Sequence, residues 1–107
     1  MTKRSVKVEL TSAGGITVEP WLVAPVNPDT MDSIDWSATR CKIKIESDHP
    51  EHFKEAFPDK YRGRVKLSIL PSVPNGTYKY RVSVLENPQK LAEVAVYSVD
   101  PDYKVDR

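Results

Sequence analysis

Cysteine is almost absent from this chain, and its scarcity limits how the fold can be held together. Cys41 is the single cysteine among 107 residues, so no disulfide can form within the chain. Small secreted domains that cannot bury a large core usually depend on such bridges. We therefore expect a fold held by packing alone, with Cys41 as a reduced and buried thiol.

Long apolar runs are also missing. Residues 1–7 are basic, and an alternating rather than a continuous apolar pattern follows them. A signal peptide contains a continuous apolar run, and a membrane-spanning helix needs about 20 such residues. We expect neither, and the cytoplasm is then the default location.

Net charge is close to zero, because 16 basic residues face 15 acidic ones. A balanced chain has no overall field that would steer it toward nucleic acid or an anionic membrane. Any basic binding site must therefore be local.

Motifs of catalysis are lacking as well. The sequence has no Gly-x-Ser-x-Gly elbow, and Gly14-Gly15 lacks the third glycine and the Lys-Ser/Thr pair of a phosphate-binding loop. Cys41 with a histidine could form a thiolate dyad, but it alternates with Ile43 and Ile45 on an apolar face. We expect no enzymatic activity and no cofactor.

Alternation of apolar and polar residues is what the sequence does have. The length predicts a single domain, 1–107. Alternation with a period of two predicts half-buried strands separated by turns and loops, among them 11–15 and 86–90. The predicted strands are 6–10, 16–19, 33–36, 41–46, 64–69, 77–84 and 94–99. Pro20 precedes a short apolar run, 21–26, and indicates an edge or a bulge there.

The clearest strand, 77–84, follows the turn dipeptide Asn75-Gly76. Its predicted inward face carries Tyr78, Tyr80, Val82 and Val84, and its outward face carries Lys79, Arg81 and Ser83.

One helical segment is predicted, 48–57. Pro50 suits a first turn and Pro58 ends the segment. Phe53, Ala56 and Phe57 would then share one face and anchor a helix that is too short to be stable alone. The fold class is therefore all-β: a Greek-key β-sandwich of about seven strands with one short helical insert.

A family resemblance rests on a few short motifs. The stretch 76–82, Gly-Thr-Tyr-Lys-Tyr-Arg-Val, resembles the late strand of immunoglobulin-like and cupredoxin-like sandwiches, where a tyrosine corner forms. Trp36 resembles the tryptophan that packs across such sandwiches. The insert 49–57 and the late Asp100-Pro101 look more like the cupredoxin plan. The resemblance implies a fold in which Tyr78 is the corner residue.

Two departures from these families concern their best-known sites. Tyr80 stands where the second cysteine of an antibody-type inter-sheet disulfide would be. Between Val84 and Tyr103 the chain has none of the Cys, His and Met ligands that blue-copper cupredoxins supply from their last loop. The resemblance therefore implies a domain without that disulfide and without that copper site.

His49 and His52 form a His-x-x-His pair, with Asp48, Glu51 and Glu55 nearby as oxygen donors. On a helix this spacing places both imidazoles on one side, as a surface zinc or copper site requires. Structural zinc usually takes four closed ligands, and only two soft ones are local. Two ordinary surface histidines are the simpler interpretation.

Six cations lie on the outward sides of predicted strands: Lys42, Lys44, Arg64, Lys66, Lys79 and Arg81. If those strands were neighbours in one sheet, the cations would form a stripe for nucleic acid or another polyanion. The alternative is a solvated sheet face whose charges prevent edge pairing.

Trp21 lies between Pro20 and Leu22 near a loop. An exposed tryptophan would be an anchor for a partner, although core packing is the simpler expectation. Taken together, the sequence predicts a non-catalytic binding or assembly module with a protein partner. The alternatives are a metal-handling protein that uses His49 and His52, and a polyanion-binding module that uses the basic residues.

Overall fold

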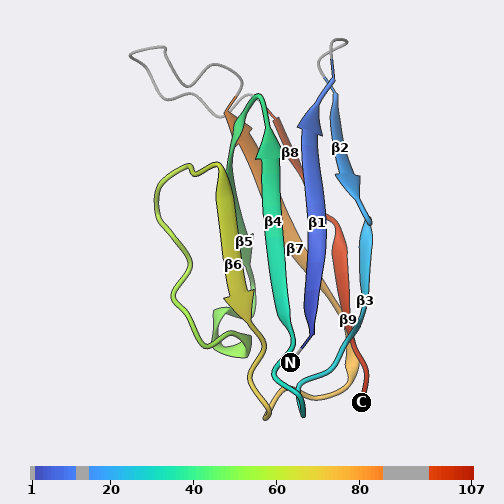
Figure 1. The fold of residues 1–107 in the computed structure, drawn as a ribbon. Coiled ribbons are helices and arrows are strands. Elements are labelled where there is room, and N and C mark those ends of the chain that lie inside the picture. Colours follow the sequence, from blue (N-terminus) through green and yellow to red (C-terminus); the bar gives the residue numbers. More distant parts are fainter. Residues whose placement is uncertain (1, 12–14, 86–96) are drawn as a thin grey trace.

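The computed structural model describes residues 2–11, 15–85 and 97–107 (Figure 1). Nine strands in these ranges form two mixed sheets of four and five strands, which face each other across a common core. The helical structure in the described ranges is one short 3-10 turn, η1 (Pro50–His52). The predicted all-β class is confirmed.

The four-stranded sheet has the order β2-β1-β4-β6. Its strands are β1 (Lys3–Leu10), β2 (Ile16–Glu19), β4 (Ser33–Thr39) and β6 (Arg64–Ser68). β1 runs antiparallel to β2 but parallel to β4. A parallel pair needs a crossover between its members, and here the crossover passes through the other sheet.

The five-stranded sheet has the order β3-β9-β7-β5, with β8 also paired to β7. Its strands are β3 (Leu22–Val26), β5 (Lys42–Ser47), β7 (Gly76–Leu85), β8 (Tyr97–Val99) and β9 (Asp102–Val105). β9 pairs with the first part of β7 and β8 with a later part. The two short strands therefore follow one another along the same side of β7.

The strand count differs from the expected seven at two places. The apolar run 21–26 contains a strand, β3, which pairs with β9 in the second sheet after the chain leaves β2. The tail contains β9 itself. Of the predicted strand 94–99, residues 97–99 form β8, while 94–96, the predicted loop 86–90 and most of the turn 11–15 lie outside the described residues.

The core is built from the inward side chains that alternation predicts. Trp36 of β4 packs against Tyr80 of β7, with ring centroids 5.3 Å apart, so these two residues join the sheets. Burial raises the pKa of Tyr80 to about 12. Cys41 is buried as expected, and loss of water contact raises the pKa of its thiol.

Ser83 departs from the predicted alternation along β7, because it is buried although it was expected to face outward. Strands flank it on both sides: its Cα partners are Lys44 on β5 and Ser98 on β8. A small hydroxyl side chain between two neighbouring strands is covered where a longer side chain would reach solvent.

Tyr78, which the resemblance makes a corner residue, bonds to the segment just before its own strand. The Tyr78 hydroxyl donates a hydrogen bond to the Pro74 carbonyl oxygen at 2.8 Å. A Cβ atom at Gly76 would come within 3.3 Å of the Tyr78 ring. Glycine at this position therefore lets the ring fold back over its own strand.

The predicted helix 48–57 is wrong. After η1 the backbone becomes extended at Phe53, which forms a β-bridge with Ile69. The Lys54 amide donates to the Ser68 carbonyl, and the Glu55 carboxylate accepts bonds from the Ser68 amide and hydroxyl. Backbone groups here bond to the end of β6 rather than within a helix.

The side chains of this segment also differ from the helical expectation. Phe53 is buried and contacts the half-buried Phe57, with ring centroids 5.4 Å apart, but Ala56 is exposed. The phenylalanines thus anchor the segment as expected, although they do so from an extended chain.

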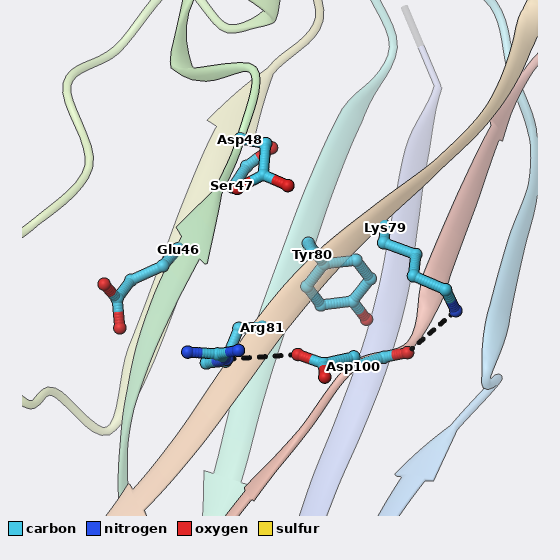
Figure 2. A pocket seen from close by; sticks show the side chains of 7 residues that line it. All are labelled: Glu46, Ser47, Asp48, Lys79, Tyr80, Arg81 and Asp100. Atoms are coloured by element: carbon cyan, nitrogen blue, oxygen red, sulfur yellow. Dashed lines mark hydrogen bonds and ion pairs between the residues drawn. The ribbon is translucent and has the colours of Figure 1, made fainter.

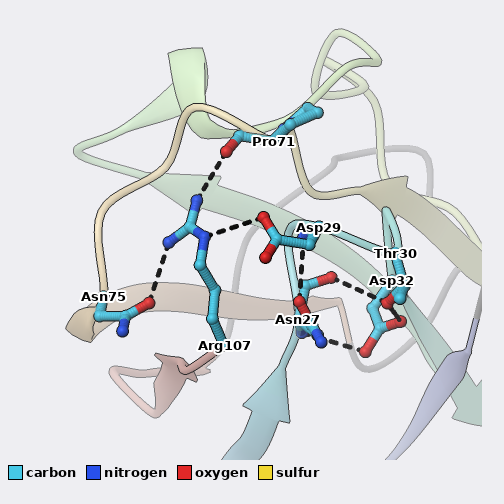
Figure 3. A network of polar contacts seen from close by, with 7 residues as sticks. All are labelled: Asn27, Asp29, Thr30, Asp32, Pro71, Asn75 and Arg107. Atoms are coloured by element: carbon cyan, nitrogen blue, oxygen red, sulfur yellow. Dashed lines mark hydrogen bonds and ion pairs between the residues drawn. The ribbon is translucent and has the colours of Figure 1, made fainter.

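Buried polar contacts hold the loops together at one end of the molecule (Figure 3). The Asp32 carboxylate accepts hydrogen bonds from the amides of Thr2 and Asn27 at 3.0 Å and from the Thr30 hydroxyl at 2.7 Å. Burial opposes the charged form, but these bonds outweigh it and lower the pKa of Asp32.

The Arg107 side chain lies between the loops at the same end (Figure 3). Its guanidinium donates to Asp29 at 3.0 Å, to the Asn75 amide oxygen at 2.9 Å and to the Pro71 carbonyl at 2.6 Å. One side chain thereby connects two loops, the one between β3 and β4 and the one between β6 and β7.

Candidate functional site

His49, Glu51 and His52 come together on the turn that follows β5. One ligand atom from each residue lies within 4.8 Å of the others. The His49 Nδ1 atom is 3.4 Å from a Glu51 carboxylate oxygen. Two imidazoles and one carboxylate are a donor set that first-row transition metals accept. We call these three residues the His-Glu-His cluster.

His52 has the more fixed position of the two histidines. Its side chain is nearly enclosed, with 8% of the residue exposed, and its Nδ1 atom lies 3.0 Å from the Tyr103 hydroxyl. The Tyr78 ring meets it edge-on with centroids 4.6 Å apart. Burial lowers the pKa of His52, and the neighbouring His49 lowers it further.

His49 lies over His52 but is much freer. The two rings are stacked with centroids 4.5 Å apart and planes only 6° from parallel. The His49 side chain is 44% exposed, and its polar contact is the one with Glu51. One member of the pair is therefore held by the core, and the other lies at the surface.

The sequence predicted this pair from its spacing, but with a wrong local structure. A three-residue 3-10 turn, not a helix, brings the histidines together. Of the three acidic candidates, Glu51 joins the cluster and Glu55 bonds to Ser68. Asp48 is exposed. Tyr103 was missed because no local pattern connects it with a histidine 51 residues away.

The six candidate cations do not share one sheet. Lys42 and Lys44 on β5 lie in the same sheet as Lys79 and Arg81 on β7, whereas β6 belongs to the other sheet. Arg64 on β6 forms a bidentate ion pair with Asp35. On β7, Lys79 pairs with Asp102 and Arg81 with Asp100, both at 3.1 Å. Ion pairs therefore partly neutralise three of the six cations.

A shallow hollow of about 280 Å³ on the five-stranded sheet is lined by side chains of both charges (Figure 2). Its lining contains three acidic and two basic side chains: Glu46, Ser47, Asp48, Lys79, Tyr80, Arg81 and Asp100. Such a mixed lining gives no preference for an anionic ligand.

Trp21 is exposed, not packed in the core. It has 47% of its surface exposed, and the adjacent Leu22 has 42%. Trp21 lies in the connection between β2 and β3, and Leu22 is the first residue of β3, which is an edge strand of the five-stranded sheet. The Trp21 carbonyl accepts a hydrogen bond from the Asp102 amide, which fixes its backbone to β9.

Comparison with protein-family models and with curated protein sequences found no match. Within the described ranges, no helix has the length and apolar character that a bilayer span requires.

Proposed function

We propose that this domain is a non-catalytic binding or assembly module that engages a protein partner through Trp21 and Leu22. The observation that carries the proposal is the exposure of these two adjacent large apolar side chains. The other large apolar residues of the described ranges are buried or partly buried. Tryptophan is among the residues that most often anchor protein interfaces.

The structure of β3, the strand that begins at Leu22, favours a partner that contacts side chains over one that adds a strand to the sheet. β3 is an edge strand, and among the described residues it pairs only with β9. Pro20 precedes it and Pro25 lies within it, and proline has no N–H to donate to an incoming strand. We expect the partner to supply an apolar surface that covers Trp21 and Leu22.

We also propose that the sheets form a Greek-key β-sandwich of the cupredoxin-like type. Two parallel strand pairs, β1 with β4 and β3 with β9, support this assignment. The immunoglobulin plan uses antiparallel sheets. Polyanion binding is less well supported, because Asp35, Asp100 and Asp102 neutralise three of the six candidate cations.

The test is a capture experiment from native lysate with three immobilised proteins. They are the wild type, the Trp21→Ser/Leu22→Ser variant and a Lys42→Ser/Lys66→Ser control that changes exposed positions on other strands. We expect the wild type and the control to retain at least one protein that the Trp21→Ser/Leu22→Ser variant does not retain. Identical capture by all three proteins would contradict the proposal.

A second measurement distinguishes a foreign partner from another copy of the same chain. Sedimentation of the wild type over a range of concentrations would reveal self-association. If the wild type forms dimers and the Trp21→Ser/Leu22→Ser variant stays monomeric, the module serves assembly of identical chains.

A further inference from the structure

The His-Glu-His cluster has donors suited to a particular class of metal ion. Imidazole nitrogen binds zinc, copper and nickel well, whereas magnesium and calcium prefer oxygen alone. The three ligand atoms lie within 4.8 Å of one another, which is wider than the spacing around a bound ion. The cluster must therefore contract when it binds, and water would complete the coordination.

Tyr103 determines which nitrogen of His52 is available. Its hydroxyl lies 3.0 Å from Nδ1, so Nε2 is the atom left for a metal. Histidines that bind metals usually donate their other N–H to an oxygen, which fixes the tautomer and the ring orientation. The Tyr103 hydroxyl can accept that bond, and Tyr103 itself is fully buried. His52 is thus held by the core in an orientation suited to a ligand.

His49 is the part of the cluster that must move. The lone pairs of an imidazole lie in the plane of its ring, and the two ring planes are nearly parallel. One ion cannot lie in both planes, so His49 has to turn out of the stack. This turn gives up the ring contacts of His49 with His52 and Tyr78, and the 44% exposure of the His49 side chain leaves space for it.

We propose that His49, Glu51 and His52 bind one Cu(II) or Zn(II) ion, with Tyr103 as the positioning residue for His52. Cu(II) should bind more tightly than Zn(II), following the usual affinity order of divalent ions at nitrogen sites. Mg(II) should not bind. The affinity should be moderate, because the site has three protein ligands and one of them must rotate.

Calorimetric titration of the purified protein with Cu(II), Zn(II) and Mg(II) tests the site directly. We expect saturable binding of one Cu(II) per chain, weakened about tenfold or more by His49→Ala. His49 is exposed enough for this variant to fold. Glu51→Gln should also weaken binding, whereas the matched control Asp48→Asn removes the same charge from a neighbouring residue outside the cluster and should not. Absence of saturable Cu(II) binding below about millimolar would overturn the proposal.

Electron paramagnetic resonance of the Cu(II) protein distinguishes coordination by the two histidines from nonspecific attraction of the ion to acidic side chains. Hyperfine splitting from two imidazole nitrogens is expected in the wild type and from one in His49→Ala. A wild-type spectrum with one nitrogen, or equal weakening by Asp48→Asn and Glu51→Gln, would contradict the assignment.

The role of Tyr103 is tested by the pair Tyr103→Phe and Tyr80→Phe. Both residues are buried tyrosines, but the Tyr80 hydroxyl makes no hydrogen bond within the described residues. Tyr103→Phe should weaken Cu(II) binding about tenfold or more and change the nitrogen splitting, and Tyr80→Phe should do neither. Equal Cu(II) affinity and spectra in both variants would exclude a positioning role for Tyr103.

Discussion

The two lateral edges of the molecule are finished in different ways. On the side of β5 and β6, the chain from 53 to 62 runs along the sheets and closes them (Figure 1). It forms bridges between Phe53 and Ile69 and between Arg62 and Ile43. On the side of β2 and β3, the chain crosses from one sheet to the other and leaves Trp21 and Leu22 exposed.

The difference shows two solutions to one problem. An edge strand offers unpaired backbone groups to any other chain. At the first edge, the backbone bonds to the segment that connects β5 and β6. At the second edge, Pro20 and Pro25 have no backbone N–H that an incoming strand could use. A closed edge can hold a side chain in a fixed position, as it does His52 of the His-Glu-His cluster. An open edge is suited to a partner.

Removal of Phe53 should have the largest effect, because it takes the main apolar anchor out of the closed edge. Phe53 is buried against Phe57 and Tyr103. We expect Phe53→Ala to lower the free energy of unfolding by about 3–5 kcal/mol in urea titrations. Phe57→Ala, at a half-buried position in the same segment, should cost clearly less. Equal losses would mean that the segment is not anchored as described.

Acid should weaken the closed edge through Asp35. The bond from Arg64, on the adjacent strand β6, lowers the pKa of this buried carboxyl. A carboxyl with a lowered pKa in the folded state stabilises the protein above its unfolded value, about 4. That contribution is lost as the pH falls from there through the folded pKa.

Urea unfolding of the wild type and Asp35→Asn between pH 6 and pH 3 measures this contribution. The wild type should lose more stability than the variant over that range. Parallel pH profiles would show that Asp35 is not the group responsible.

Tyr78 connects the closed edge to the long strand β7. Its ring contacts both histidines after β5, and its hydroxyl bonds to Pro74. We expect Tyr78→Phe to cost about 1 kcal/mol of unfolding free energy, because the Pro74 carbonyl loses its donor. Tyr80→Phe is the control, since no described group bonds to its hydroxyl. If Tyr78→Phe loses no more than Tyr80→Phe, the corner bond does not stabilise the fold.

Alternation was sufficient to predict most of the core. Burial of one face imposes a period of two on β1, β5 and β6, and the residues that it placed inward, such as Val6, Ile43 and Leu67, are buried. It failed where pairing partners lie far apart in the sequence. β3 and β9 pair with each other and form short strands, and residues 53–55 bond to β6 in place of forming a helix.

In the candidate metal site too, the local feature could be predicted from the sequence and the contact between distant residues could not. The His-x-x-His spacing brings two imidazoles together in a helix or in a tighter turn, so the pair could be predicted despite the wrong helix. The contact of Tyr103 with His52 depends on the register of β9 against β7, where Tyr103 stands opposite Tyr78. Nothing near either residue in the sequence specifies that register.

The smallest effect on stability is expected at the open edge. Leu22 is 42% exposed, and substitutions at such surface positions usually change the free energy of unfolding by less than about 0.5 kcal/mol. Leu22→Ser should therefore leave the urea midpoint close to that of the wild type while it reduces capture of the partner. A loss comparable to that of Phe53→Ala would show that Leu22 supports the fold, and the exposed pair would no longer indicate an interface.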